Sequence, residues 1–431
     1  MTSLASAKED KVKVVGDIYN KNAELEIETS GTVHRKQQLK VHGNFLLEAA
    51  PGCHIIHDNK PPKWIVGIDP FVPEDFGLSI DNEDQMPDIS IDPDSGLLTC
   101  INRHNSNIRT FYISVSCNSY DKNFHLMERG QARDAKGRLF ECVTFVIVLE
   151  PRKLIDVCYL EPSTTSTCDN SDSDDIVQSN KYNLYSDIQD ISLLQYKSPL
   201  LNHLDSNMTK ILENMTDKEK YCNYTFPFKV NVQSSNGNKQ NRAKTNQSIQ
   251  MTLSGKINLS STTPILCSQG FCGCFTHFFK ATLHAIDLEC PVDSPVLAIS
   301  DGVVVEIKQD NIVGGIHASN LYKWNSIMLK LDDGRFVEYV HIKANSVLVH
   351  VGDVVKRGQH ICSSGDVGFC PRPHLHIQMH NTDAKDAPTI PFGFKRYAPD
   401  TKDSNIILDQ GDVYFIPEAG QYYTENGLCR V

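Results

Sequence analysis

The sequence predicts a mainly β protein with two folded domains separated by a linker. Runs of β-branched and aromatic residues, such as CVTFVIVL at 142–149 and VVVEI at 303–307, have the composition of strands. Asp, Gly and Pro residues with turn-forming character separate these runs. No long helical pattern appears between residues 266 and 395.

Length and charge limit the classes of partner. A chain of 431 residues, with 22% charged and 40% hydrophobic residues, is long enough for more than one core. The net charge is −11 and Lys and Arg are scattered, so the chain has no basic face to bind nucleic acid or anionic lipid. No run approaches the about 18 apolar residues that cross a bilayer, and the start MTSLASAKEDKVKVV lacks the apolar core of a secretory signal. We expect a monomer without a membrane span.

The cysteines do not decide the redox compartment. All 14 are dispersed, without the paired CxxC set of a zinc finger, and the tightest pair is Cys272 and Cys274. Glycosylation triplets would suit a secreted protein, but an Asn-rich and Ser-rich chain also produces them by chance. They begin at Asn207, Asn214, Asn223, Asn246 and Asn258.

The amino-terminal half is predicted as an extension, residues 1–32, followed by a β-sandwich-like domain, residues 33–162. Strands are expected at FYISVSC (111–117), CVTFVIVL and LIDVCYL (154–160). PDISIDPDSGLLT (87–99) places an Asp-Ser-Gly turn between two extended runs and resembles a segment of immunoglobulin-like and cadherin-like sandwiches. A generic β domain is the favoured alternative.

The middle of the chain changes composition. Residues 163–206 are predicted as an acidic, Ser-rich linker because DNSDSDD (169–175) has too little apolar surface to order itself. Residues 207–265 are an uncertain region with one alternating stretch, KVNVQ (229–233). A second β domain is predicted at 266–395, and a carboxy-terminal tail at 396–431.

Within 266–395, strands are predicted at VVVEI, SIMLKL (326–331) and RFVEYVHI (335–342). The last two form a hairpin through Asp332, Asp333 and Gly334. PHLHIQM (373–379) is also expected to be extended, because its proline disfavours a helix and alternation continues beyond it.

Two histidines in this last strand share one face. His374 and His376 are two residues apart, so both imidazoles emerge together while Leu375 faces the core. The pair suits one metal ligand beside one proton-transfer group. Tyr339 and His341 repeat this geometry on another predicted strand, so they too are expected to share one face. An isolated HxH is more often a pair without a function, so the prediction depends on its combination with other residues.

A carboxylate completes the combination. Asp287 lies in HAIDLECPVDSPVLAISDGVVV (284–305), and a carboxylate oxygen with imidazole nitrogens is a normal ligand set for catalytic zinc. Together these segments resemble the lysostaphin-type (LytM-like) zinc metallopeptidases, in order and in separation. The matching pieces are Asp287 with Pro291, SPVLAISDGVVV, DDGRFVEYVHI, VGDVVKRGQHICSSGDVG and PHLHIQ.

The resemblance implies an antiparallel β groove for residues 266–395 with one Zn²⁺ ion. It makes Asp287 and His376 ligands, and it makes His341 and His374 the groups that activate water and steady the oxyanion. Many members place the remaining histidine four residues before the aspartate, where this chain has Leu283. Other members carry this histidine farther upstream on a loop, which is the position of His277 in this chain.

His284 is the alternative to His277 as the third ligand. In a strand it would face away from Asp287, three residues later, whereas a loop can fold His277 back. We therefore assign His277. The other histidines of this domain have no such setting and are predicted as surface or packing residues; they are His317, His350, His360 and His380.

Two features of SSGDVG (363–368) stay open. Gly365 and Gly368 permit a tight turn at the groove wall, or they simply end a strand. Cys362 and Cys370 flank that turn, where a disulfide and free thiols are equal alternatives.

The resemblance implies a zinc endopeptidase that hydrolyses peptide bonds in bacterial peptidoglycan cross-bridges or stem peptides. Such a substrate implies action outside the cell or in a phagosome, and the cytoplasm is the expectation otherwise. A catalytically inactive relative that binds peptide or glycan, or activates a partner enzyme, is the main alternative. VGDVVKRGQ (351–359) is also similar to biotinyl and lipoyl carrier domains, but the candidate hairpin tip carries Asp332 and Asp333 instead of the required lysine.

Overall fold

The structure is a computed structural model, and it is built from strands. It describes residues 12–15, 23–29, 32–33, 37–57, 89–92, 94–103, 108–161, 191–198, 224–228, 264–279, 281–384, 387–395, 414–424 and 427–429. The mainly β prediction is confirmed, since the helices in these ranges are the short 3-10 turns η1 (Leu47–Ala49) and η3 (Ala318–Asn320). Neither has the length to span a membrane, and no other described segment is such a helix. The acidic run at 169–175 and KVNVQ at 229–233 lie outside the described residues.

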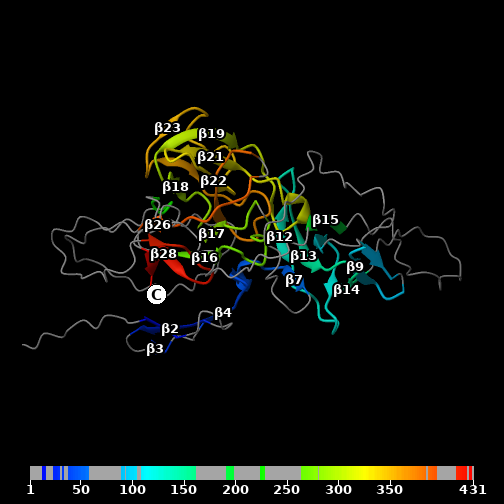
Figure 1. The fold of residues 1–431 in the computed structure, drawn as a ribbon. Coiled ribbons are helices and arrows are strands. Elements are labelled where there is room, and N and C mark those ends of the chain that lie inside the picture. The colour runs from blue at the N-terminus through cyan, green and yellow to red at the C-terminus, as the bar shows by residue number, and fades with distance from the viewer. Residues whose placement is uncertain are drawn as a thin grey trace, which may run out of the picture.

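An eleven-stranded sheet, here called the large sheet, forms most of the carboxy-terminal half (Figure 1). Its central neighbours β19, β21, β22, β25, β17 and β16 pair in that order, and each pair is antiparallel. The strands are β16 (Ile265–Gln269), β17 (Ile286–Glu289), β19 (Gly302–Lys308), β21 (Ser326–Leu331), β22 (Phe336–Val340), β23 (Val354–Val355), β25 (His374–His380), β28 (Tyr422–Thr424), β29 (Gly427–Cys429), β5 (Val41–His42) and β6 (Phe45–Leu46).

The predicted hairpin at 326–342 is present, but its second strand ends early. Gly334 adopts a φ of +87° at the turn, where a side chain would be strained. β22 stops at Val340 because His341 has a φ of 61°. The prediction that Tyr339 and His341 share a face is therefore wrong. Tyr339 is fully buried in the core of the large sheet and its hydroxyl accepts a hydrogen bond from the Ile299 amide.

The amino-terminal half contains two sheets that share a hydrophobic core. One contains β7 (Cys53–His57), β10 (Ile108–Val115), β12 (Gly130–Arg133), β13 (Leu139–Leu149) and β15 (Ile191–Ser198), and is extended by β20 (Gly314–Gly315) from the carboxy-terminal half; the other contains β8 (Ile89–Ile91), β9 (Leu97–Ile101), β11 (Ser119–Tyr120) and β14 (Leu154–Leu160). Residues from both sheets, including Leu98, Phe111, Phe145 and Cys158, form one buried cluster. The arrangement is sandwich-like, and its resemblance to any one sandwich family stays a prediction.

Shorter pairings complete the described fold. A four-stranded sheet contains β1 (Val12–Val15), β2 (Ala23–Thr29), β3 (Thr32–Val33) and β4 (Gln37–Leu39), and two-stranded pairs join β18 (Pro295–Leu297) with β24 (His360–Ser363) and β26 (Phe394–Lys395) with β27 (Tyr414–Phe415). β15 lies within the stretch predicted as a linker, where the pattern ISLLQYKS pairs with β10. The predicted domain limits themselves stay predictions.

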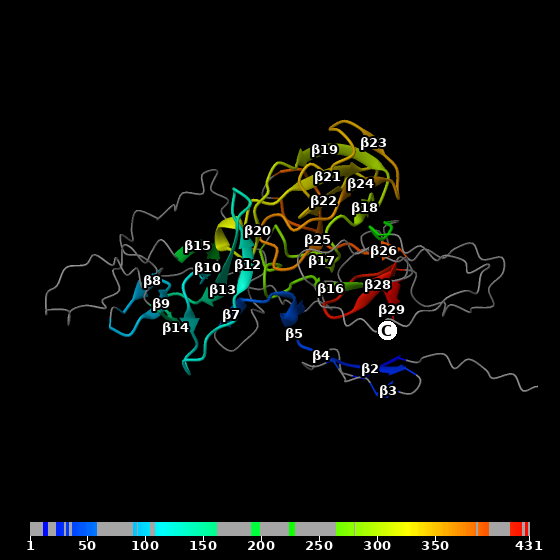
Figure 2. The same ribbon diagram turned by 180° about the vertical axis from the view of Figure 1, so that it is seen from behind.

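The two halves are joined by backbone pairing and by packing (Figure 2). β12 pairs with β20, and Phe45 of β6 pairs with Gln269 of β16. A second hydrophobic cluster lies between the halves and combines Tyr112 and Val146 with Phe275 and Phe369. The amino-terminal half therefore contacts the loops that surround the polar face of β25.

Candidate metal centre

Asp287 and His376 are cross-strand partners. They lie opposite each other in the antiparallel pair of β17 and β25. Both side chains are buried, and His376 Nδ1 lies 2.9 Å from Asp287 Oδ1. Alternation along β25 sends Leu375 and Ile377 into the core of the large sheet and leaves His376 on the other face.

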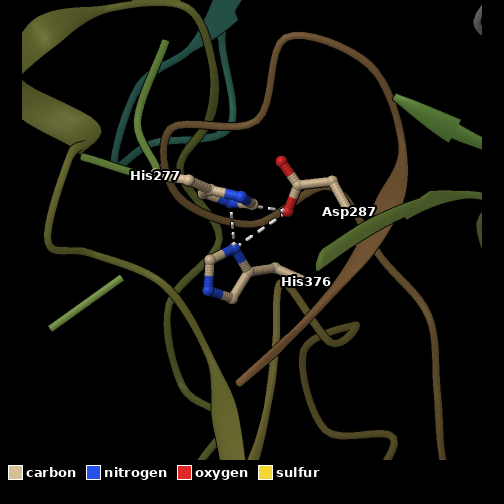
Figure 3. Close-up of side chains that lie close together, drawn as sticks. All are labelled: His277, Asp287 and His376. Carbon is tan, nitrogen blue, oxygen red and sulfur yellow. Dashed lines mark hydrogen bonds and ion pairs between the residues drawn. The ribbon is translucent and has the colours of Figure 1, made fainter. Parts of the chain in front are cut away.

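His277 reaches the same point from a turn. Its Nε2 lies 3.2 Å from Asp287 Oδ1 and 3.2 Å from His376 Nδ1 (Figure 3). Ligands at the usual zinc distances of a tetrahedral site are separated by about 3.3 Å. The three atoms therefore have the spacing of one face of a zinc tetrahedron.

Each imidazole also has a hydrogen-bond partner on its far side, and a proton on the far nitrogen leaves the near nitrogen free to bind a cation. His277 Nδ1 donates to the Gly270 carbonyl at 3.0 Å, and His376 Nε2 donates to Gln378 Oε1 at 2.9 Å. The Gln378 amide is oriented because its Nε2 donates to Glu338 Oε2 at 2.8 Å. In the neutral rings, two nitrogen lone pairs therefore converge on a carboxylate oxygen. Only a cation or added protons can satisfy three acceptors at this distance.

Gln269 on β16 supports both the carboxylate and the turn. Its Nε2 donates to Asp287 Oδ2 at 2.9 Å, and its Oε1 accepts hydrogen bonds from the amides of Phe275 and Thr276 at 3.1 and 3.0 Å. These bonds hold the turn that carries His277. Sequence reasoning missed Gln269 and also missed Gln378. The sequence does contain a signal for Gln378, because this residue continues the alternating pattern of His374 and His376 along β25.

The charges at this point favour a cation. Burial raises the pKa of the Asp287 carboxyl, but the charges of His277 and His374 and hydrogen bonds from His277 and His376 outweigh burial and hold it well below its usual value. Burial lowers the pKa of His376, yet its hydrogen bond to Asp287 and the charge of that carboxylate raise it overall. The carboxylate is thus ionised, and it attracts positive charge to the adjacent ring.

His341 and His374 stand beside these three residues. Their ring centroids are 4.6 Å apart, and His374 Nε2 lies 3.5 Å from Asp287 Oδ1. His341 Nδ1 donates to the Val367 carbonyl at 2.6 Å, and His374 Nδ1 donates to the Arg372 carbonyl at 2.8 Å. Burial lowers the pKa of both rings, and the charge of the neighbouring histidines lowers it further. Each neutral ring therefore has Nε2 available as a proton acceptor.

His284 lies apart from Asp287. Its Nδ1 donates to the Thr389 carbonyl at 3.0 Å, and its ring meets Phe271 edge to face. Burial lowers the pKa of His284 to about 4. The structure therefore brings His277, and not His284, to the centre.

The remaining histidines of this half lie outside the centre. His380 donates to the Ala387 carbonyl, and His317 contacts Phe140. His350 is exposed, and His360 is bonded to the Cys362 carbonyl. Cys362 and Cys370 are both free thiols, so no disulfide joins them.

A small cavity opens at the centre. Its volume is about 30 Å³, enough for a cation with one or two water molecules. Asp287, His341, His374 and His376 line it together with residues from neighbouring segments. The latter are Phe45, Ala49, Ser268, Phe275, Thr276, Glu289, Phe369, Pro371 and Arg372. Two of these, Phe45 and Ala49, come from the amino-terminal half.

Comparisons with known proteins cover the segment that carries Asp287 and His376, and the matched family segment begins after His277. Residues 282–388 match peptidase family M23. Over 117 residues the chain is 37% identical to the glycyl-glycine endopeptidase ALE-1 of Staphylococcus capitis, which covers 27% of this chain and 29% of that protein. It is 35% identical to lysostaphin of Staphylococcus simulans over 117 residues, covering 27% and 22%. It is 30% identical to the peptidoglycan DD-endopeptidase ShyA of Vibrio cholerae over 96 residues, covering 22% and 20%.

Solved structures of similar sequence include the catalytic domain of the antimicrobial peptidase lysostaphin from Staphylococcus simulans. It is 34% identical, covers 26% of this chain and 77% of that chain, and has a TM-score of 0.21. A zinc containing peptidase from Vibrio cholerae is 27% identical, covers 23% and 27%, and has a TM-score of 0.19. The chain spans less than a third of the length of the curated relatives named above. Residues 282–388 are a peptidase M23 domain with lysostaphin-type relatives.

Proposed function

We propose that this chain is a zinc-dependent endopeptidase that hydrolyses peptide bonds in bacterial peptidoglycan. One observation carries the proposal: two imidazole nitrogens and a carboxylate oxygen converge within 3.2 Å of one another. A divalent cation satisfies all three acceptors at once.

The chain provides three zinc ligands, which would leave the fourth coordination position free. His277 Nε2, Asp287 Oδ1 and His376 Nδ1 would hold Zn²⁺, and the adjoining cavity is large enough for water or a substrate oxygen. Zinc in such a site supplies a Lewis acid and lowers the pKa of bound water toward about 7. The hydrogen bonds of Gly270, Gln269 and Gln378 keep the three ligands in position before the cation arrives.

His374 and His341 would move protons. Each ring is anchored through Nδ1 to a carbonyl and presents Nε2 to the cavity. We assign His374 as the base that accepts a proton from the attacking water and later delivers it to the leaving nitrogen. We assign His341 to the oxyanion. Because its Nδ1–H already donates to Val367, it donates to the oxyanion only after Nε2 is protonated.

The substrate class comes from the relatives. Their names describe a glycyl-glycine endopeptidase and a peptidoglycan DD-endopeptidase, which supports cross-bridges or stem peptides of peptidoglycan as the substrate of this chain. Such a substrate places the reaction outside the cell or in a phagosome.

The second candidate is an inactive relative that binds peptide or glycan at the same residues. The two candidates differ in turnover.

Elemental analysis of the full chain, together with cleavage of a pentaglycine peptide and of purified cell walls, tests the proposal. We expect one zinc per chain and cleavage by the wild type. His277→Ala should lose the metal and more than about a thousandfold of kcat/KM. His284→Ala is the control and should keep both. Zinc bound without cleavage of either substrate would support the binding module, and zinc lost only in His284→Ala would overturn the ligand assignment.

A further inference from the structure

His341 reaches the centre only by leaving its strand. Tyr339, two residues earlier, faces the core of the large sheet, so an extended chain would send His341 to that core as well. Its φ of 61° turns the ring toward His374 instead. A residue other than glycine is strained in this region and persists only where its surroundings hold it.

The loop at 364–370 supplies that support. The Val367 carbonyl accepts the hydrogen bond from His341 Nδ1 at 2.6 Å. Gly365 packs against the backbone on the other side, where a Cβ atom would lie 2.8 Å from the His341 carbonyl oxygen. The same loop brings Cys370 Sγ to 3.3 Å from His374 Nδ1. The position of this loop therefore sets the direction of the His341 ring.

The amino-terminal half holds the loop through an ion pair. Arg133 Nη1 lies 2.9 Å from Asp366 Oδ2, and Arg133 Nη2 lies 2.7 Å from Asp366 Oδ1. These two parallel bonds form a bidentate pair, and the side chains are 25% and 21% exposed. Arg133 Nε also donates to the Ile312 carbonyl at 2.5 Å, so the guanidinium is fixed on both sides.

Backbone pairing continues the connection. β12 pairs with β20, and the two glycines of β20 form bridges with Val367 and Cys370. A Cβ atom on Gly314 would lie 2.6 Å from the Asp366 carbonyl oxygen and 2.9 Å from Arg133 Nη2. Glycine is therefore required for this close approach. β12, β20 and the loop form one continuous unit beside His341.

We propose that Arg133 is a positioning residue for the peptidase reaction: through Asp366 it holds the loop whose Val367 carbonyl orients His341. This inference rests on the proposed function for its kinetic consequences. It makes the amino-terminal sheet a part of the catalytic machinery, since Arg133 lies on β12 and far from Asp366 in sequence.

Kinetics of Arg133→Met test the proposal, with Arg138→Met as the matched control. Arg138 is close to Arg133 in the sequence and pairs with Asp134 at 2.7 Å, but it is 72% exposed and its partner is not in the loop. We expect Arg133→Met to lower kcat about tenfold with unchanged KM and zinc content, because His341, the group assigned to the oxyanion, is misplaced. Arg138→Met should change none of these. Arg133→Lys should recover part of the loss, since a lysine keeps the charge without the fork.

The pair should also behave as a unit. In a double-mutant cycle on kcat, Arg133→Met combined with Asp366→Asn should be no slower than the slower single variant. Additive losses, or equal kcat values for Arg133→Met and Arg138→Met, would overturn the role of Arg133.

An imidazole NMR measurement separates this inference from the proposed function. In ¹⁵N-histidine-labelled protein, the Nδ1–H signal of His341, assigned by its loss in His341→Ala, should shift or broaden in Arg133→Met. The Nδ1–H signal of His277 should stay in place. If the wild type binds no zinc or cleaves no peptide, the proposed function fails, yet this signal still decides the inference. An unmoved His341 signal rejects the positioning role of Arg133.

Discussion

β13 and β25 both contain long runs of buried residues, but their buried faces differ in polarity. In β13, Val143, Phe145 and Ile147 face the core between the amino-terminal sheets, while Val146 and Val148 face the cluster against the peptidase domain. Both faces are largely apolar. In β25 every residue is buried, but the residues that alternate with Leu375, Ile377 and Met379 are polar. They are His374, His376, Gln378 and His380.

The difference shows where stability and function are separated in this fold. An apolar face gains free energy by leaving water, in proportion to its area. A buried polar face loses about 1–3 kcal/mol for each group left without a hydrogen bond. The polar face of β25 is kept because residues from distant segments bond to it, including Glu338 and Asp287. We therefore expect mutations on β13 to act on stability and mutations on β25 to act on the metal centre.

Phe145→Ala tests the apolar side of this comparison. Phe145 is fully buried, so the substitution should lower the free energy of unfolding by about 3–5 kcal/mol. Zinc content and kcat/KM of the folded protein should stay at wild-type values. Chemical denaturation followed by fluorescence, with zinc analysis of the folded fraction, measures both.

Leu139→Ala on the same strand is the control, because Leu139 is 62% exposed and should change stability by less than about 0.5 kcal/mol. A loss of zinc in Phe145→Ala at temperatures where the protein is folded would show that the two strands are not separate in function.

Sequence patterns predicted much of this arrangement. LIDVCYL coincides with β14, and the HxH spacing placed two histidines on one face of β25. Alternation and turn residues are local signals, and they survive in a single sequence. The strand at 335–342 was predicted too long because the left-handed conformation of His341 is held by a loop that follows 23 or more residues later.

The support of the centre was not predictable in the same way. Gln269 bonds to Asp287 from another strand, and Arg133 bonds to Asp366 across the two halves. Neither residue stands in a periodic pattern that distinguishes it from an ordinary surface residue. Such contacts are set by the tertiary fold, so one sequence offers no local mark of them.

Gln378→Leu tests the polar side of the comparison. The leucine would remove the acceptor of His376 Nε2 and leave Glu338 Oε2 without its donor. We expect zinc affinity to fall about 10–100-fold, as for other residues that orient a metal ligand. Competition with a fluorescent zinc chelator measures the dissociation constant.

His380→Leu is the matched control, since His380 lies on the same face of β25 but bonds to the Ala387 carbonyl. It should lower stability while zinc affinity stays within twofold of wild type. Equal affinities for Gln378→Leu and wild type would contradict the orienting role of the Gln378 amide.

Histidines away from the centre should set the response of stability to acid, and His317 is the clearest case. Burial lowers the pKa of His317 to about 4, from an ordinary value of 6.5. The folded state therefore keeps this ring neutral while the unfolded chain takes up a proton. Stability is fully present above pH 6.5 and is lost as the pH falls toward 4, by at most about 1.4 kcal/mol per pH unit for this group.

His317→Asn separates this effect from the metal centre. His317 is the N-cap of η3, where its side chain accepts a hydrogen bond from the Ser319 amide, and asparagine can replace that acceptor without titrating. Between pH 6.5 and 5.5 the metal-free variant should lose about 1 kcal/mol less stability than the metal-free wild type. Urea unfolding in the presence of a chelator measures the difference. His317 contacts Phe140 of β13, away from the polar face of β25. An equal loss of stability in both proteins would show that other groups, such as those on the polar face of β25, set the acid response.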